Sequence, residues 1–268
     1  MRKIVKLSDQ NIKIRAEIVW FDATVRKKRR QEKHVVRKNT SSNNVFSYWS
    51  DGEVNCPPLV RMCIDSHRRA YPDNYILLDD SCIENWIKVP KIIKEKRACM
   101  SKTHYSDIIR LLLLKEHGGI WLDSTVFITN KLQIESGSFF AFTRPKDPFL
   151  LSSWYLQTFS PNNYLISKWL ESLLNYWSEH NSLNDYFLLH YLFEANYHQD
   201  RKFRKIWASR EFYTFEDPHL LQSILLDKFD SAKLEMVLAK SGIHKLTWKL
   251  PEFLPEDCNL RYLLRSNY

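Results

Sequence analysis

Two charged residues of opposite sign, Asp107 and Arg110, stand three positions apart in a strongly apolar stretch, residues 102–117. If this stretch is helical, the carboxylate and the guanidinium share one face of the helix. They can form a structural ion pair, or they can offer donors and acceptors to the hydroxyl groups of a sugar. The spacing alone leaves both interpretations open.

A third charged residue, Asp123, follows the same stretch at a defined distance. Gly118 and Gly119 end the predicted helix and permit a sharp reversal, because glycine adopts positive φ. Residues 120–122 then predict a short strand that ends at Asp123. A carboxylate at a strand end can hold a divalent cation on a diphosphate, or it can cap a turn. The whole pattern, SDxxR–GG–IWLD, is more specific than any of its parts.

The elements that must position these residues predict an α/β fold. Residues 45–49 and 75–78 read as strands, and a helix between them opens at Pro57 and Pro58. The helix and strand described above continue this alternation, and an extended segment follows at 126–129. Such an alternation of strands and helices predicts an open sheet that is at least partly parallel. Because such sheets bind ligands at the carboxyl ends of their strands, the turn after residue 49 and the residues after 122 become candidate sites.

The second half of the chain reads as mainly helical. We expect helices from about residue 152 onward, with the clearest patterns over 164–177 and 183–194. Residues 244–250 alternate apolar and polar side chains and predict a late strand, after which two prolines introduce an irregular tail.

Charge is unevenly distributed along the chain. Residues 1–38 hold 13 of the 40 basic residues and 4 of the 31 acidic ones, so the remainder carries 27 of each. A formally neutral body argues against a nucleic-acid-binding face over the domain, and we expect no nucleic acid partner. The basic arm suits a solvated helix or contact with an anionic membrane surface.

Cysteine usage and hydropathy indicate a cytoplasmic chain. The five cysteines show no spacing typical of zinc sites, and reduced thiols are the simple interpretation. The N-terminus has no apolar segment of the secretory type, and no run approaches the roughly 18 apolar residues of a membrane-spanning helix. Any membrane contact is therefore expected to be peripheral, at the inner face.

Residues 106–125 resemble the donor-binding core of glycosyltransferases that carry the DXD motif. In particular, the chain resembles the family of bacterial capsular polysaccharide synthesis glycosyltransferases, which are related to retaining mannosyl- and glucosyltransferases. Further matching pieces are FSYW at 46–49 with Gly52 and Pro57, residues 71–72 and 75–80, DYF at 185–187 with His190, and HKL at 244–246.

The resemblance implies a GT-A-like fold, a single Rossmann-type open sheet with added helices. Together with the charge distribution and the polar linker near residue 40, it leads us to expect a basic helical arm at 1–40, a glycosyltransferase domain at 41–250 and a C-terminal tail at 251–268. The domain would divide into a donor half, 41–150, and an acceptor half, 151–250. The residues implied in donor binding are Trp49, Asp107, Arg110, Gly118, Gly119, Trp121, Asp123 and Lys245.

One departure from the DXD motif concerns the metal, although the capsule-type branch of the family often has the D-x-T form seen here. Thr125 stands where the motif usually has its second aspartate, and a neutral hydroxyl is a poorer ligand than a carboxylate. A Mn²⁺ or Mg²⁺ ion would need Asp123, Thr125, the donor diphosphate and a late residue such as His244. His244 also reads as a half-buried strand histidine, and Lys245 could itself neutralise the leaving diphosphate.

The implied activity is transfer of a hexose from a nucleotide sugar, with a UDP-sugar as the expected donor, to a capsular, cell-surface or lipid-linked glycan. By resemblance the transfer would retain the anomeric configuration, and the leaving phosphate would take the acceptor proton. Asp185 is the candidate near the acceptor, although it also suits the start of a helix. The alternative is a protein that keeps the fold as a binding module and has lost catalysis.

Overall fold

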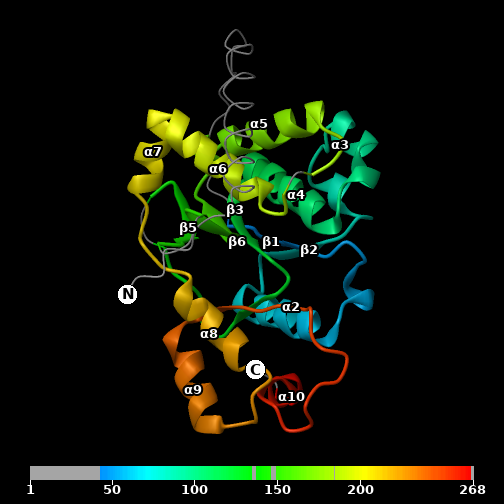
Figure 1. Cartoon of the computed structure of the whole chain (residues 1–268), viewed down its shortest axis with the longest axis vertical. Helices are drawn as coiled ribbons and strands as arrows, with labels where there is room; N and C mark the ends of the chain where they lie inside the picture. The colour runs from blue at the N-terminus through cyan, green and yellow to red at the C-terminus, as the bar shows by residue number, and fades with distance from the viewer. Residues whose placement is uncertain (1–42, 135–136, 146–148, 184, 267–268) are drawn as a thin grey trace.

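A five-stranded sheet forms the centre of the computed structural model, which describes residues 43–134, 137–145, 149–183 and 185–266 (Figure 1). Its order is β2-β1-β3-β6-β5. Strand β1 runs parallel to β2 and β3, whereas β6 runs antiparallel to β3 and β5. The predicted open α/β sheet, parallel in part, is confirmed. The strands span Val45–Tyr48 (β1), Tyr75–Leu78 (β2), Gly119–Leu122 (β3), Phe139–Thr143 (β5) and Leu151–Thr158 (β6).

Helices cover both faces of this sheet. Figure 1 shows one helical layer above the sheet, formed by α3 (Lys91–Glu95), α4 (Lys102–His117), α5 (Tyr164–Glu179), α6 (Leu188–Gln199) and α7 (Arg201–Ala208). The layer below contains α2 (Pro58–Ala70), α8 (Glu216–Ile224), α9 (Ser231–Lys240) and α10 (Asn259–Arg265). Three 3₁₀ turns, at Glu53–Asn55, Ile83–Asn85 and Arg97–Cys99, lie in the connections.

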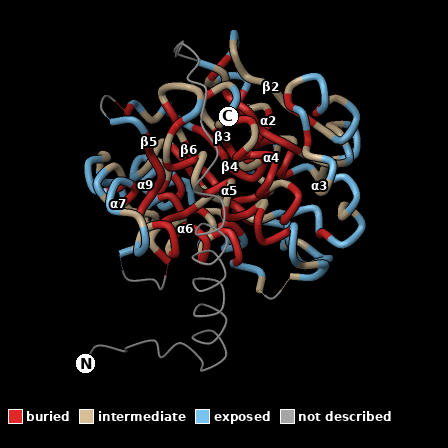
Figure 2. The backbone as a smooth tube through the Cα atoms, turned by 90° about the horizontal axis from the view of Figure 1, so that it is seen from above, coloured by how far each residue is buried: buried red, intermediate tan, exposed pale blue. Residues whose placement is uncertain are grey.

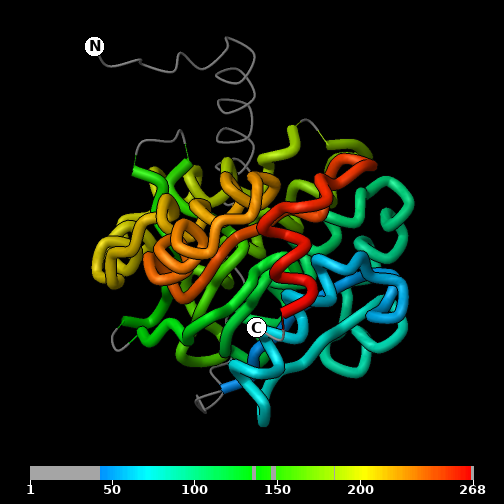
Figure 3. Tube along the Cα trace, turned by 90° about the horizontal axis from the view of Figure 1, so that it is seen from below, coloured from blue at the N-terminus to red at the C-terminus, as the bar shows by residue number. Residues whose placement is uncertain are grey.

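A second, two-stranded sheet lies on the lower side of the molecule. It pairs β4 (Val126–Ile128) with β7 (Ile243–Lys245), antiparallel. Two hydrogen bonds from buried side chains of α2 hold β4 in place. The His67 ring is hydrogen-bonded to the Val126 carbonyl at 2.5 Å, and the Ser66 hydroxyl accepts from the Ile128 amide at 3.0 Å. Seen from below, the C-terminal elements, orange to red, lie over this side of the molecule (Figure 3). The chain therefore returns late to the region that follows β3.

Helix α4 is central to the core. The Ser101 hydroxyl caps it by accepting from the His104 amide at 3.3 Å, and it ends at Gly118, whose φ is 68°. Its apolar residues are buried on several sides, because α5 packs on one side and β1 and β3 on the other. The tube view shows this buried interior surrounded by exposed loops (Figure 2). The predicted boundaries of this helix are confirmed.

Three expectations for the second half of the chain were wrong or only partly right. Residues 151–158 form strand β6 instead of a helix, because this strand is buried on both faces and shows no regular alternation. Helix α6 begins at Leu188, later than expected. Strand β7 is three residues long because its partner β4 is equally short.

The predicted basic arm, 1–40, lies outside the described residues.

The C-terminal segment contains a short helix, α10. Its Leu260 and Leu263 are buried in one apolar cluster with Leu59 and Cys63 of α2. The predicted division of the chain into arm, domain and tail stays a prediction.

Close approach of two backbones at the start of β3 generates the first testable prediction. A Cβ on Gly119, where φ is +89°, would lie 2.2 Å from the carbonyl oxygen of Asn44. We expect Gly119→Ala to lower the free energy of unfolding by about 2 to 5 kcal/mol, through overpacking and backbone strain. Gly137→Ala is the matched control, since its φ is +101° but the nearest atom to its Cβ is 3.8 Å away. Equal losses for the two variants, measured by denaturant unfolding, would contradict this account.

Candidate functional site

A cavity of about 690 Å³ opens where β1 and β3 end. We call it the strand-end cavity. Its walls come from the residues after β1, the residues after β3, one side of α4, and the segment that follows β7. The side chains that matter below are Trp49, Ser106, Arg110, Trp121, Asp123, Thr125, Tyr186, Lys245 and Trp248. Its location agrees with the prediction that ligands bind at the carboxyl ends of these strands.

Arg110 ties helix α4 to the sheet beneath it. Its guanidinium lies 3.1 Å from the Asp107 carboxylate and 3.4 Å from the Asp123 carboxylate. It also donates to the carbonyl of Ser153 in β6 at 2.8 Å and lies 5.1 Å from the ring centre of Trp121. Only 4% of this side chain is exposed, so the guanidinium is held by fixed partners. The predicted ion pair therefore exists, and a third group shares it.

Asp123 is surrounded by donors. The indole N–H of Trp121 donates to Oδ1 at 2.9 Å, and the Lys245 ammonium lies 3.0 Å from Oδ2. Burial by itself raises the pKa of this carboxyl, but the nearby Lys245 and Arg110 charges lower it to about 2. Asp123 is consequently ionised throughout the neutral range.

Asp107 behaves differently although it shares the same guanidinium. Burial raises its pKa to about 7, the Arg110 charge opposes this, and the Asp123 charge adds to it. Asp107 lies behind Arg110 and is not among the residues that line the strand-end cavity. The geometry places Asp107 as a support for Arg110; its side chain is 10% exposed, and its contact with the donor stays a prediction.

Lys245 reaches Asp123 because of the β4–β7 register. That register sets Lys245 opposite Val126, the residue directly after Thr125. The ammonium then donates to the Thr125 hydroxyl at 2.6 Å as well as to Asp123. One lysine thus binds both side chains of the D-x-T sequence.

His244 lies on the other face of the same strand. Successive strand residues point to opposite sides, so His244 points away from the cavity that Lys245 enters. Its ring is fully buried, contacts the Phe127 ring, and lies 3.2 Å from the Thr129 hydroxyl. Burial lowers its pKa to about 4. The structure therefore does not bring His244 together with Asp123 and Thr125.

The remaining side chains do not fit a divalent cation. Both Asp123 oxygens already face positive or N–H groups, and the Thr125 oxygen accepts from Lys245. Within the described ranges, no group of three His, Cys, Asp or Glu side chains is placed to hold a metal ion. A hard divalent ion needs several oxygen ligands, and this donor set offers one carboxylate that two cations neutralise.

Aromatic side chains form part of the cavity wall. Trp49, predicted near the nucleotide base, packs edge to face against Trp248 with ring centres 5.9 Å apart. Trp248 is 48% exposed and Tyr186 is 58% exposed, so both present apolar surface to solvent at the cavity. Sequence reasoning missed these two. Trp248 lies inside the predicted late strand, 244–250, whereas the observed strand β7 ends at Lys245, so the strand-end rule points to Trp248 only once the true end of the strand is known.

Besides Asp107 and His244, three further predicted residues lie outside the strand-end cavity. Gly118 and Gly119 are at the opposite end of β3 from Asp123, where a Cβ on Gly118 would lie 2.9 Å from the Ser160 backbone. Their conformation serves chain packing. Asp185 accepts from the Phe187 amide at 2.7 Å, but it is not the N-cap of α6, which begins at Leu188 with Phe187 at the cap; its neighbour Tyr186 lines the cavity.

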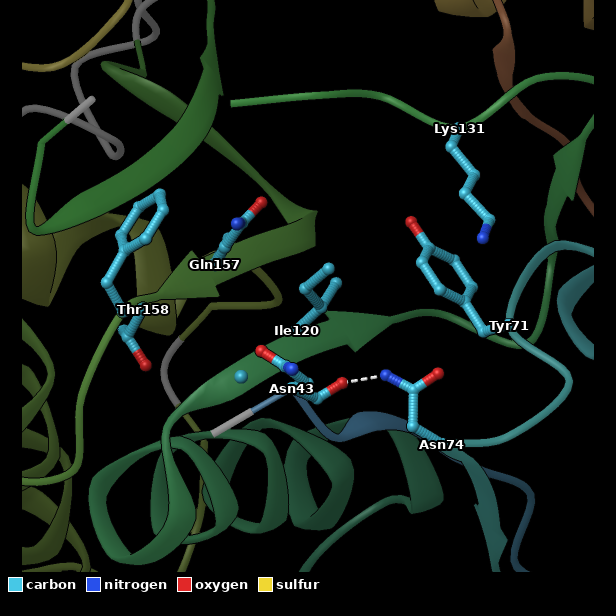
Figure 4. A pocket seen from close by; sticks show the side chains of 9 residues that line it. Asn43, Tyr71, Asn74, Ile120, Lys131, Gln157 and Thr158 are labelled. Atoms are coloured by element: carbon cyan, nitrogen blue, oxygen red, sulfur yellow. Dashed lines mark hydrogen bonds between the residues drawn. The ribbon is translucent and has the colours of Figure 1, made fainter. Parts of the chain in front are cut away.

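A second, smaller cavity of about 350 Å³ lies at the amino end of β3 (Figure 4). Asn74 donates to the Asn43 carbonyl there, and the Lys131 ammonium lies 5.2 Å from the ring centre of Tyr71. Among the described residues that line it, Lys131 alone is charged and none is acidic. This cavity lacks the charged groups that meet at Asp123.

Comparisons with known proteins agree with the resemblance described above. The O-glycosyltransferase PaGT of Phomopsis amygdali is 26% identical over 171 residues, which cover 55% of this chain and 42% of that protein. The O-glycosyltransferase braB of Annulohypoxylon truncatum is 28% identical over 172 residues, covering 55% and 40%. This chain therefore spans about two fifths of the length of these two relatives.

This chain also matches a solved glycosyltransferase structure and a family of known proteins. The PaToxG glycosyltransferase is 16% identical, covers 85% of this chain and 92% of its own, and has a TM-score of 0.45. Residues 6–256 match the family described as capsular polysaccharide synthesis protein. Since this match spans most of the 268 residues, the chain belongs to the capsular polysaccharide synthesis protein family.

Proposed function

We propose that this chain is a glycosyltransferase that transfers a hexose from a nucleotide sugar, with a UDP-sugar as the expected donor. One observation carries the proposal: an ionised carboxylate, Asp123, lies between two cations, Arg110 and Lys245, in a cavity at the strand ends. Membership of the capsular polysaccharide synthesis family and the two glycosyltransferase relatives support it.

The donor nucleotide would lie against the aromatic wall. Trp49 has a buried indole N–H with no partner in the part of the chain that is described, and a carbonyl of the base could accept from it. The exposed ring of Trp248 offers stacking surface beside it. The sugar and the diphosphate would then reach Asp123, with the Arg110 side chain and the Trp121 ring behind them.

Departure of the nucleoside diphosphate is the step that these charges would assist. The bond from the anomeric carbon to the β-phosphate oxygen breaks, and its electron pair goes to the phosphate. Lys245 and Arg110 stabilise that developing negative charge because they are already oriented and partly desolvated. The acceptor hydroxyl oxygen bonds to the anomeric carbon, and its proton passes to a phosphate oxygen.

Retention of configuration belongs to the same proposal. Asp123 is an unsuitable nucleophile, since both oxygens already contact Trp121, Arg110 or Lys245 and its pKa is lowered to about 2. Attack from the side of the leaving group requires no enzyme nucleophile. Asp185 stays a candidate near the acceptor through its neighbour Tyr186, which lines the cavity.

The acceptor would be a capsular, cell-surface or lipid-linked glycan. The basic residues within 1–38, which lie outside the described residues, would hold the protein at an anionic membrane surface. None of the helices in the described ranges is long and apolar enough to span a bilayer. Vesicle binding that is lost on deletion of residues 1–38 would support the surface role.

A binding protein without catalysis is the second candidate function. The observation that favours it is Thr125, which replaces a carboxylate and is already bonded to Lys245. Hydrolysis of donors in a panel of nucleotide hexoses separates the two, since a pure binding protein would bind a donor and never release its sugar.

The carboxylates generate the second prediction. We expect Asp123→Asn to lower donor hydrolysis and transfer about 100-fold, because the neutral amide no longer orients both cations toward the diphosphate. Asp107→Asn should give a smaller loss by loosening Arg110. The matched control is Asp227→Asn, which removes an exposed carboxylate paired with Lys233. Full activity in both Asp123→Asn and Asp107→Asn would overturn the site assignment.

The aromatic wall generates the third prediction. We expect Trp248→Ala and Trp49→Ala each to weaken UDP binding about 10-fold, because stacking on a base contributes roughly 1–3 kcal/mol. Isothermal titration calorimetry measures this directly. Phe212→Ala is the control, since Phe212 is 65% exposed and does not line the strand-end cavity. Unchanged affinity in both tryptophan variants would show that the base binds elsewhere.

A further inference from the structure

Lys245 occupies an unusual position relative to the D-x-T sequence. Its ammonium lies 3.0 Å from the Asp123 carboxylate and 2.6 Å from the Thr125 hydroxyl. In a D-x-D protein these two side chains would be the pair available to a divalent cation, and here they face one lysine. We propose that Lys245 supplies the charge a divalent cation would otherwise supply, so that this chain binds a nucleoside diphosphate without a metal ion. This inference rests on the proposed function.

The backbone holds the ammonium in this position. The β4–β7 register pairs Val126 with Lys245, and the Leu246 amide donates to the Thr125 carbonyl at 2.9 Å. Backbone pairing between β4 and β7 therefore fixes the main chain on both sides of Lys245. Its side chain is 20% exposed, so the charge is partly shielded from water yet open toward the cavity.

Thr125 suits a lysine better than a metal. A hydroxyl accepts one hydrogen bond from the ammonium and leaves its positive charge in place, whereas a second carboxylate would neutralise it. An ammonium has three N–H bonds, and among the described residues two of them meet Asp123 and Thr125. The third remains for a phosphate oxygen. The threonine that departs from the DXD motif therefore matches the lysine that faces it.

The charge balance of the cluster also opposes a bound metal. Arg110 and Lys245 already contribute two positive charges around the ionised Asp123. A divalent ion between them would meet like charges on both sides in a poorly solvated site. A diphosphate, in contrast, would meet the Lys245 ammonium directly, while the Arg110 charge is shared between Asp107 and Asp123. Two other lysines line the cavity: Lys102 is paired at 2.6 Å with Asp51, and Lys249 is exposed directly after Trp248.

Calorimetry with UDP, GDP, ADP and CDP, in EDTA and then in Mn²⁺, tests the inference on the unmodified chain. We expect the tightest of the four to bind with dissociation constants that agree within about 3-fold in the two conditions. We also expect the electron paramagnetic resonance signal of free Mn²⁺ to persist when the protein is added. Binding that disappears in EDTA and returns with Mn²⁺ would overturn the inference and leave the proposed function standing.

Variants of Lys245 supply the second arm. Lys245→Met should weaken nucleotide binding in EDTA at least 30-fold, and Lys245→Arg, which keeps the cation, should lose far less. Melting curves establish that each variant is folded, and Lys240→Ala on the surface is the control for loss of a lysine. The double variant Lys245→Ala with Thr125→Asp, which restores two carboxylates, should bind the nucleotide only when Mn²⁺ is present.

The remaining outcomes are separable. Nucleotide affinity in EDTA that is equal in Lys245→Met and the unmodified chain would overturn the role of Lys245. If none of the four nucleotides binds in either condition, the proposed donor site fails and the inference fails with it.

Discussion

A buried guanidinium holds this protein's site together. Arg110 contacts Asp107 on its own helix, Asp123 after β3, and the Ser153 carbonyl in β6. Removing the guanidinium would leave the Asp107 and Asp123 carboxyl groups without this buried cation, which costs far more than a surface ion pair contributes. The helix, two strands and the turn after β3 are therefore fixed relative to one another by the same group that would face the donor.

The parts predicted from the sequence are those whose signals are local. Helix α4 combines a serine cap, a long apolar run and terminal glycines, and strand β3 begins directly after its C-cap residue, Gly118. Strand β6 gives no such signal, because burial on both faces removes the alternation that identifies a strand. The sequence pattern of residues 151–158 is compatible with either element, and only pairing with β3 and β5 decides between them.

The site divides in the same way. Asp107, Arg110 and Asp123 lie close together in sequence, and the structure brings them together. Lys245 lies 122 positions from Asp123, and its arrival depends on the register of a three-residue strand pair. The same register turns His244 away, because a shift of one residue reverses the face of a side chain. The pairing of β7 with β4, and not the local sequence, therefore determines that Lys245 enters the site and His244 does not.

The most direct test of the donor site is a crystal structure of the protein with UDP bound. We expect a diphosphate whose oxygens contact the Lys245 ammonium beside Asp123, and a uracil ring against Trp49 and Trp248. UDP bound instead in the smaller cavity at the amino end of β3, beside Lys131, would contradict this expectation.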